Sequence, residues 1–226
     1  MKRFMILWMI PILAVALFGA YGRSTHTNLV NYQDLSGVYE AEIGYHLMTP
    51  MEPDTKQEIM DWFAAEELIA IVRATGNNRQ LGERTLMEVE ILQVIQGDPT
   101  VEGETVDFVS DFYFSMIGVE AGYVPLCTGA LVNYMKQGNE YLISMSEWPR
   151  PKGWTDQLGR YYYSSQHSVV PYLNLDDIPN QLPEQIENRQ SPPRYKEMPD
   201  NEVFILNEES LDSFLGLKHA IFSLYL

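Results

Sequence analysis

The stretch from residue 84 to residue 96 carries the pattern that most restricts the fold of this chain. Apolar residues occupy alternate positions from Met87 to Ile91 and glutamates lie between them, which is the two-residue period of a strand with one buried face. At Leu92 and Val94 the apolar residues move onto the other face. A change of phase inside a long strand predicts a bulge or bend, the feature that turns a sheet at the corner of a barrel.

Four further segments carry strand patterns. Leu68–Val72 is a short apolar run typical of a strand buried on both faces, and residues 104–114 and 140–146 alternate between apolar and polar side chains. Residues 161–163 together with residues 168–173 predict one or two more strands. The alternation over residues 104–114 places four side chains on one face: Val106, Phe108, Phe112 and Phe114.

Helices are expected on both sides of this β region. Thr55 and Glu58 form a capping-box pattern ahead of a helix over residues 55–66. A second helix follows Asn207, a favourable N-cap residue, with acidic side chains in its first turn. Residues 178–200 contain too many prolines for regular structure and predict a covering loop, and residues 203–205 predict a short strand.

These elements predict a mainly β (α+β) chain: a small OB-like barrel with flanking helices, with a β-sandwich as the competing architecture. The barrel domain is expected at residues 54–175. Residues 176–226 are expected to be a proline-rich loop and a C-terminal helix that packs on the barrel. The segment between residues 115 and 139 contains several glycines and is expected to be a loop.

The N-terminus predicts export. Lys2 and Arg3 precede nineteen residues without a charge, from Phe4 to Gly22. Residues 1–22 fit either a signal peptide cleaved near Ala16 or a membrane anchor that crosses once. Both interpretations place the protein outside the cell or anchored in the cell membrane with the residues after 22 outside, and both leave residues 23–53 as a spacer.

Charge excludes two classes of partner. Residues 21–226 contain 13 basic against 31 acidic side chains, a formal charge of −18. Nucleic-acid binding and docking on anionic lipid both need basic clusters, so we expect no nucleic acid and no membrane contact beyond the N-terminal segment. Cys127 is the one cysteine, so the domain has no internal disulfide and depends on its core.

Part of the chain resembles a recurrent pattern in exported proteins of Gram-positive bacteria. The matching residues are Leu68–Arg73, Thr85–Asp98, Gly103–Val109 and Lys136–Ile143. The resemblance implies an OB-like or netrin/TIMP-like β-barrel, and most domains of this kind have no assigned activity. Their motif describes strands and turns rather than chemistry.

No catalytic or metal motif is present in the sequence, and no cofactor is expected. The four histidines are scattered without the spacing of a zinc site. Asp107 and Asp111 share one strand face, with Glu88 and Glu90 opposite, and a solvated polar face is favoured there over a weak cation site. Ser165 and His167 are sequence neighbours, which does not establish a catalytic dyad.

The densest unusual feature is a group of aromatic residues after the strand at residues 140–146. Half of the group is expected in the core, and the rest offers a surface for a protein or glycan, since Tyr and Trp combine rigid contact area with a polar edge. The candidate binding residues are Trp148, Trp154, Tyr161, Tyr163 and Tyr172.

The favoured function is a non-catalytic binding or interaction domain at the bacterial cell surface, with protease inhibition as one form suggested by analogy of fold alone. Two alternatives stay open. One is an extracellular hydrolase whose catalytic groups, His167 among them, converge from distant positions. The other is a membrane-tethered structural component of an envelope complex.

Overall fold

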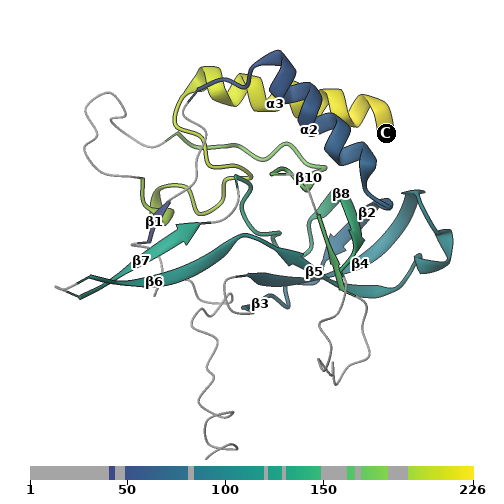
Figure 1. Cartoon of the computed structure of the whole chain (residues 1–226), viewed down its shortest axis with the longest axis horizontal. Coiled ribbons are helices and arrows are strands. Elements are labelled where there is room, and N and C mark those ends of the chain that lie inside the picture. The colour runs from purple at the N-terminus through teal and green to yellow at the C-terminus, as the bar shows by residue number, and fades with distance from the viewer. Residues whose placement is uncertain are drawn as a thin grey trace, which may run out of the picture.

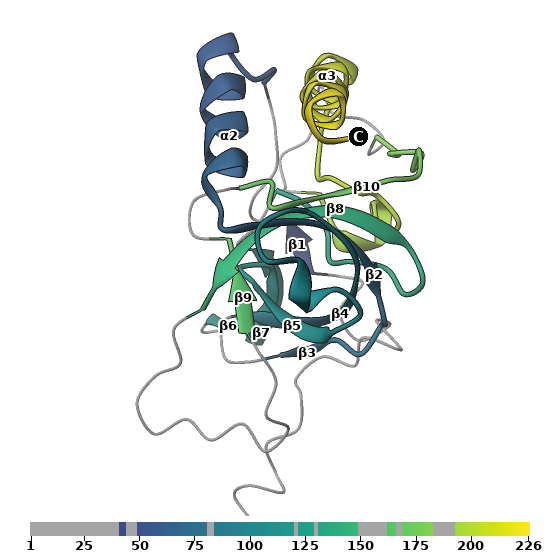
Figure 2. The same cartoon turned by 90° about the vertical axis from the view of Figure 1, so that its right-hand side faces the viewer.

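The computed structural model describes residues 41–43, 49–80, 84–119, 122–128, 131–148, 162–165, 169–182 and 193–226. A β-barrel lies on one side of this part of the chain and two helices lie together on the other, as the two perpendicular views show (Figures 1 and 2). The elements of the barrel and its extensions are β2 (Leu68–Ala74), β3 (Arg79–Gln80), β4 (Thr85–Gln96), β5 (Thr105–Ser110), β8 (Glu140–Glu147), β9 (Tyr162–Ser164) and β10 (Tyr172–Asn174).

Five strands close the barrel. Neighbouring strands follow the order β2, β4, β5, β9, β8, and β8 returns to β2, so the ring has no open edge. The pairing of β5 with β9 is parallel, and all the other pairings in the ring are antiparallel. A meander of three strands that closes through a parallel third and fifth strand is the arrangement of an OB-type barrel. The predicted mainly β fold with an OB-like barrel is therefore confirmed, and the competing β-sandwich is not found.

The long strand bends where the sequence predicted. Along the β2–β4 pair the register shifts twice, so that Leu92 and Ile95 of β4 have no direct partner on β2. Extra residues of this kind are β-bulges, which increase the local twist of a strand. They allow β4 to pair with β5 through its first half and with β2 through its second half.

The predicted strand over residues 104–114 is two strands. It breaks at Asp111 and Phe112, after which β6 (Tyr113–Val119) and β7 (Gly122–Thr128) form an antiparallel hairpin that extends away from the barrel (Figure 1). β1 (Glu42–Ile43) adds to β7 in parallel. The loop expected over residues 115–139 was wrong for its first half. Glycines there had suggested a loop, but Gly118 and Gly122 lie within the paired strands.

Both helices agree with the prediction in position. α2 (Pro53–Ala65) begins with a proline, which suits the first turn of a helix, and the capping box at Thr55 was wrong because Glu52 is the N-cap residue and makes no side-chain cap bond. α3 (Glu208–Tyr225) is capped as expected, because the Asn207 side chain accepts a hydrogen bond from the Ser210 amide at 2.8 Å.

The C-terminal segment is tied to the barrel by its backbone. We call residues 193–206 the strap; it contains the short 3-10 helix η4 (Tyr195–Glu197). The amides of Asn133 and Phe204 bond to the carbonyls of Glu202 and Leu131, respectively. The strand predicted at residues 203–205 was wrong, because Val203 and Ile205 carry isolated bridges, the first to Val132, in place of a ladder.

One continuous core joins the barrel, the strap and both helices. Phe108 and Tyr141 both meet the ring of Tyr172 edge to face, with centroids 5.7 and 5.9 Å apart. Phe63 of α2 meets Tyr225 of α3 at 5.9 Å. Within the described ranges, no helix has the length and apolar character needed to cross a membrane; the segment 1–22 lies outside those ranges.

Candidate functional site

A hollow of about 410 Å³ opens at the end of the barrel where β2 begins and β8 ends. Its floor is apolar and includes Leu68 and Tyr163, which are 3% and 9% exposed. Thr100 and Val101 of the short 3-10 helix η2 (Pro99–Val101), which joins β4 to β5, form one wall. The described residues that line it are Glu67, Leu68, Asp98, Thr100, Val101, Glu104, Glu147 and Tyr163.

Among the residues that the structure describes, four carboxylates line this hollow and no basic side chain does. Glu67 precedes β2, Asp98 and Glu104 lie in the connection between β4 and β5, and Glu147 ends β8; all four are exposed. Thr100 donates to Asp98 Oδ1 from its amide at 2.9 Å and from its hydroxyl at 2.8 Å, and these bonds lower the pKa of the Asp98 carboxyl. The hollow is thus chemically suited to a cation with an apolar part.

Glu66 lies next to this hollow in the chain but points into the protein. Its side chain is 3% exposed and accepts hydrogen bonds from the hydroxyls of Ser146 and Ser165. The Ser165 bond is 3.0 Å long. Ser165 therefore donates to a buried carboxylate. His167, the partner that the hydrolase hypothesis needs, lies outside the described residues.

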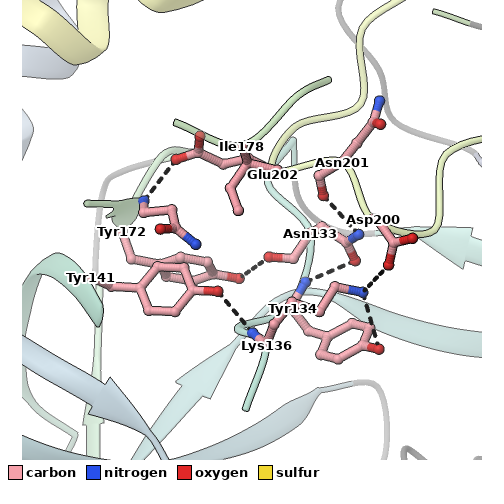
Figure 3. Close-up of a pocket in the computed structure, with 10 residues that line it drawn as sticks. Asn133, Tyr134, Lys136, Tyr141, Tyr172, Ile178, Asp200, Asn201 and Glu202 are labelled. Carbon is pink, nitrogen blue, oxygen red and sulfur yellow. Dashed lines mark hydrogen bonds and ion pairs between the residues drawn. The ribbon is translucent and has the colours of Figure 1, made fainter. Parts of the chain in front are cut away.

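A second, smaller pocket lies between the barrel and the strap (Figure 3). Its free volume of about 10 Å³ gives room for no more than one water molecule. Asn133 organises its wall: its carbonyl accepts from Tyr172 Oη at 2.8 Å, and its side-chain nitrogen donates to the carbonyl of Asn201 at 2.9 Å. These contacts fasten the strap to the barrel and leave no room for a ligand larger than water.

Two titratable groups in this pocket are strongly perturbed. Burial lowers the pKa of Lys136 from 10.5 to about 8, although the negative charge of Asp200 opposes this change. Burial also raises the pKa of Tyr141 to about 12. The Tyr141 hydroxyl accepts a hydrogen bond from the Lys136 amide at 2.8 Å.

Glu202 lies on the far side of the pocket and pairs with a buried lysine. Its carboxylate accepts from Lys218 Nζ at 2.8 Å and from the Asn174 amide at 2.7 Å. Burial raises the pKa of Glu202, and the neighbouring Lys218 ammonium counteracts this effect. The pair connects the strap to α3.

The candidate aromatic residues fall into separate places. Tyr163 forms part of the floor of the carboxylate hollow. Tyr172 is 2% exposed and belongs to the core, as was expected for half of the group. Trp148 packs beside Tyr162, with Arg84 5.7 Å from its ring centroid. Trp154 and Tyr161 lie outside the described residues.

The expected polar strand face is buried at its centre. Asp107 is fully buried and receives a 2.7 Å bond from Arg79, and Glu88 accepts from Thr75 Oγ1 and Asn77 Nδ2. The favoured solvated face was therefore wrong at these two positions, because the segment that carries Thr75 and Arg79 covers them. In the described ranges no three His, Cys, Asp or Glu side chains are grouped closely enough to hold a metal ion.

The carboxylate hollow was missed from the sequence. Its acidic residues are separated by up to 80 positions, and no local spacing links them. The one signal that pointed there was Tyr163, which belonged to the aromatic group. A comparison with protein-family models found no match, and comparisons with curated proteins and with solved structures found none either.

Proposed function

We propose that this chain is an exported, non-catalytic binding domain whose contact site is the carboxylate hollow at the end of the barrel. The observation that carries the proposal is the hollow itself. Its volume of about 410 Å³ falls within the usual range of ligand sites. It combines an apolar floor with a rim of carboxylates.

The proposed partner is a protein that presents a lysine or arginine side chain to this hollow. A long basic side chain places its methylene groups on Leu68 and Tyr163 and its charge among the carboxylates, an arrangement that satisfies both ends of the side chain. The overall negative charge supports the same partner, because it attracts basic surfaces and speeds their encounter. A glycan partner would use the tyrosine without depending on the rim charge.

The N-terminal segment and the resemblance to exported proteins of Gram-positive bacteria support the placement at the cell surface. A signal peptide would release the domain, and an anchor would hold it at the membrane with the barrel outside. The binding proposal requires neither form in particular, because the hollow belongs to the barrel.

The test is an in-cell crosslinking pull-down with the full-length tagged chain and its Glu67→Gln/Glu104→Gln/Glu147→Gln variant. A partner should be recovered with the original chain and reduced at least about tenfold with the variant, because three rim charges are lost. Raised salt should weaken the same complex, since exposed charges are screened. Mass spectrometry of the bait also identifies its N-terminus.

The matched control is Glu58→Gln/Glu209→Gln/Asp212→Asn, which removes the same charge from exposed positions on α2 and α3. It should leave partner recovery unchanged. Equal loss in both variants would show that net charge, and not the hollow, controls binding. Equal recovery in both would reject the hollow as the contact site, and a partner lost only after Tyr163→Ala would favour a glycan.

A further inference from the structure

Lys136 occupies an unusual position at the edge of the pocket between barrel and strap (Figure 3). Its side chain is 26% exposed. Nζ donates to the carbonyl of Pro199 and to Tyr134 Oη, the latter at 3.2 Å, and it lies 4.2 Å from the centroid of the Tyr134 ring. The amine is thus held in one place and is still reachable from solvent.

These contacts use two of the three N–H groups of an ammonium ion. The nearest carboxylate oxygen, Oδ1 of Asp200, is 4.0 Å away and belongs to a side chain that is 90% exposed. The other described ionisable groups that line the pocket are Tyr134, Tyr141, Tyr172 and Glu202. A neutral amine keeps both hydrogen bonds and directs its lone pair along the third position, so losing one proton sacrifices neither bond.

Lys218 and Lys196 differ from Lys136 in pairing and in exposure, respectively, whereas Lys56 is partly buried as Lys136 is. Lys218 is 3% exposed and paired with Glu202, so neither its proton nor its lone pair is available. Lys196 is exposed on the strap, and Lys56 is half-buried on α2. Partial burial without a close carboxylate is what favours the neutral, nucleophilic form of an amine.

We propose that Lys136 is a covalent acylation site that reacts preferentially with small activated acyl donors, such as anhydrides or thioesters. Neutral Nζ attacks the acyl carbon and forms a C–N bond. The bond from that carbon to the leaving group breaks, and the leaving group takes the bonding electrons. The proton displaced from nitrogen ends on the leaving group, so no oxidant or reductant is needed.

Acylation at this position has a structural consequence. The product amide has a single N–H, so it cannot keep both the Pro199 and the Tyr134 bonds. One of these two bonds is lost, together with the attraction between the ammonium and Asp200 of the strap, and the acyl group has to turn toward solvent because the pocket has room for no more than a water molecule. Acylation therefore loosens the strap beside residues 199–202.

The test is competitive labelling of the folded chain with trace acetic anhydride between pH 6.5 and 9.5, read residue by residue with mass spectrometry. At pH 7.5 Lys136 should be acetylated at least about tenfold faster than the exposed Lys196, because burial lowers the pKa of Lys136 to about 8 and so enlarges its share of neutral amine. A rate equal to or below that of Lys196 overturns the proposal.

Two variants separate reactivity from simple exposure. Asp200→Asn removes the charge that favours the ammonium form, so it should raise the Lys136 rate roughly twofold at pH 7.5 and leave the Lys196 rate unchanged. An unchanged Lys136 rate also overturns the proposal. Lys136→Arg keeps the cation without the reactive amine, and its loss of the labelled peptide verifies the assignment.

Discussion

Glu202 and Lys218 form a buried ion pair in which each charge depends on the other as its partner. Their side chains are 5% and 3% exposed, and the carboxylate uses both oxygens, one for Lys218 and one for the Asn174 amide. Such a pair adds little net stability compared with apolar residues of the same size, but either partner alone is strongly destabilising. The pair therefore specifies how the strap and α3 meet.

Lys218→Met should lower the free energy of unfolding by about 3–5 kcal/mol, because it leaves the Glu202 carboxylate buried without a counter-charge. Adding Glu202→Gln should recover more than half of that loss, since glutamine still accepts from Asn174. Urea unfolding of both variants measures this. The control is Lys196→Met, at an exposed position, which should change stability by less than about 0.5 kcal/mol. A loss of stability in Lys218→Met as small as that of the control would contradict the prediction.

The pKa of Lys136 also makes stability depend on pH. Folding lowers that pKa from 10.5 to about 8, so between these values the unfolded chain binds the proton more tightly, and stability rises with pH. From pH 8 to pH 10 the original chain should gain about 2 kcal/mol relative to Lys136→Met. Urea unfolding at each pH provides the difference, and parallel curves would disprove it. Folding raises the pKa of Tyr141 to about 12. Above pH 10 the unfolded chain therefore loses the phenol proton first, and Tyr141 lowers stability as the pH rises.

At the scale of the elements, sequence periodicity predicted the features that depend on strand pairing, and it missed those that depend on contacts between distant segments. The phase change at Leu92 marked a real bulge, because an extra residue in one strand shifts every later side chain to the other face. The break after Ser110 was missed, since Phe108 before it and Phe112 and Phe114 after it are all buried and keep the alternation unbroken. The covering of Asp107 by Arg79 and the assembly of the hollow depend on tertiary contacts between distant segments, which no local pattern encodes.

The turn after β4 gives an element-scale prediction. Gly97 has φ +111°, and a Cβ there would lie 2.6 Å from the Glu67 carbonyl oxygen and 3.0 Å from Leu68 Cδ1. Gly97→Ala should cost about 3 kcal/mol or more, because the start of β2 has to move. Gly103, with φ +80°, has nothing within 4 Å of such an atom, so Gly103→Ala should cost about 1 kcal/mol. Thermal unfolding compares the two; equal costs would rule out the clash.

At the scale of the whole molecule, α3 is a structural part of the domain and not an appendage. Phe214, Leu217 and Ile221 are at most 1% exposed and belong to the same core as the barrel residues. Burying side chains of this size contributes about 1.5–3 kcal/mol each. The sum for these three side chains alone approaches the entire stability of an ordinary domain.

A chain that ends at Leu206 should therefore lose its cooperative thermal transition and bind a hydrophobic dye. Near-UV circular dichroism during heating measures the first property, and dye fluorescence measures the second. Removing Leu226 alone, a residue 64% exposed, should leave the midpoint within about 1 °C of its original value. A truncated chain with a sharp transition would show that the barrel folds independently.

The closure of the barrel by β9 also sets an order in time. β2, β4 and β5 are neighbours in the chain and can pair as soon as they are synthesised. The other edge of β2 stays unpaired until residues 140–145 are available, and the other edge of β5 stays unpaired until residues 162–164 are available. Pairing across such separations is slow, because a long loop must be closed before any contact forms. Pulsed hydrogen exchange during refolding should show protection at β4 before β9; until β9 arrives, the growing chain carries two strand edges open to any other strand it meets.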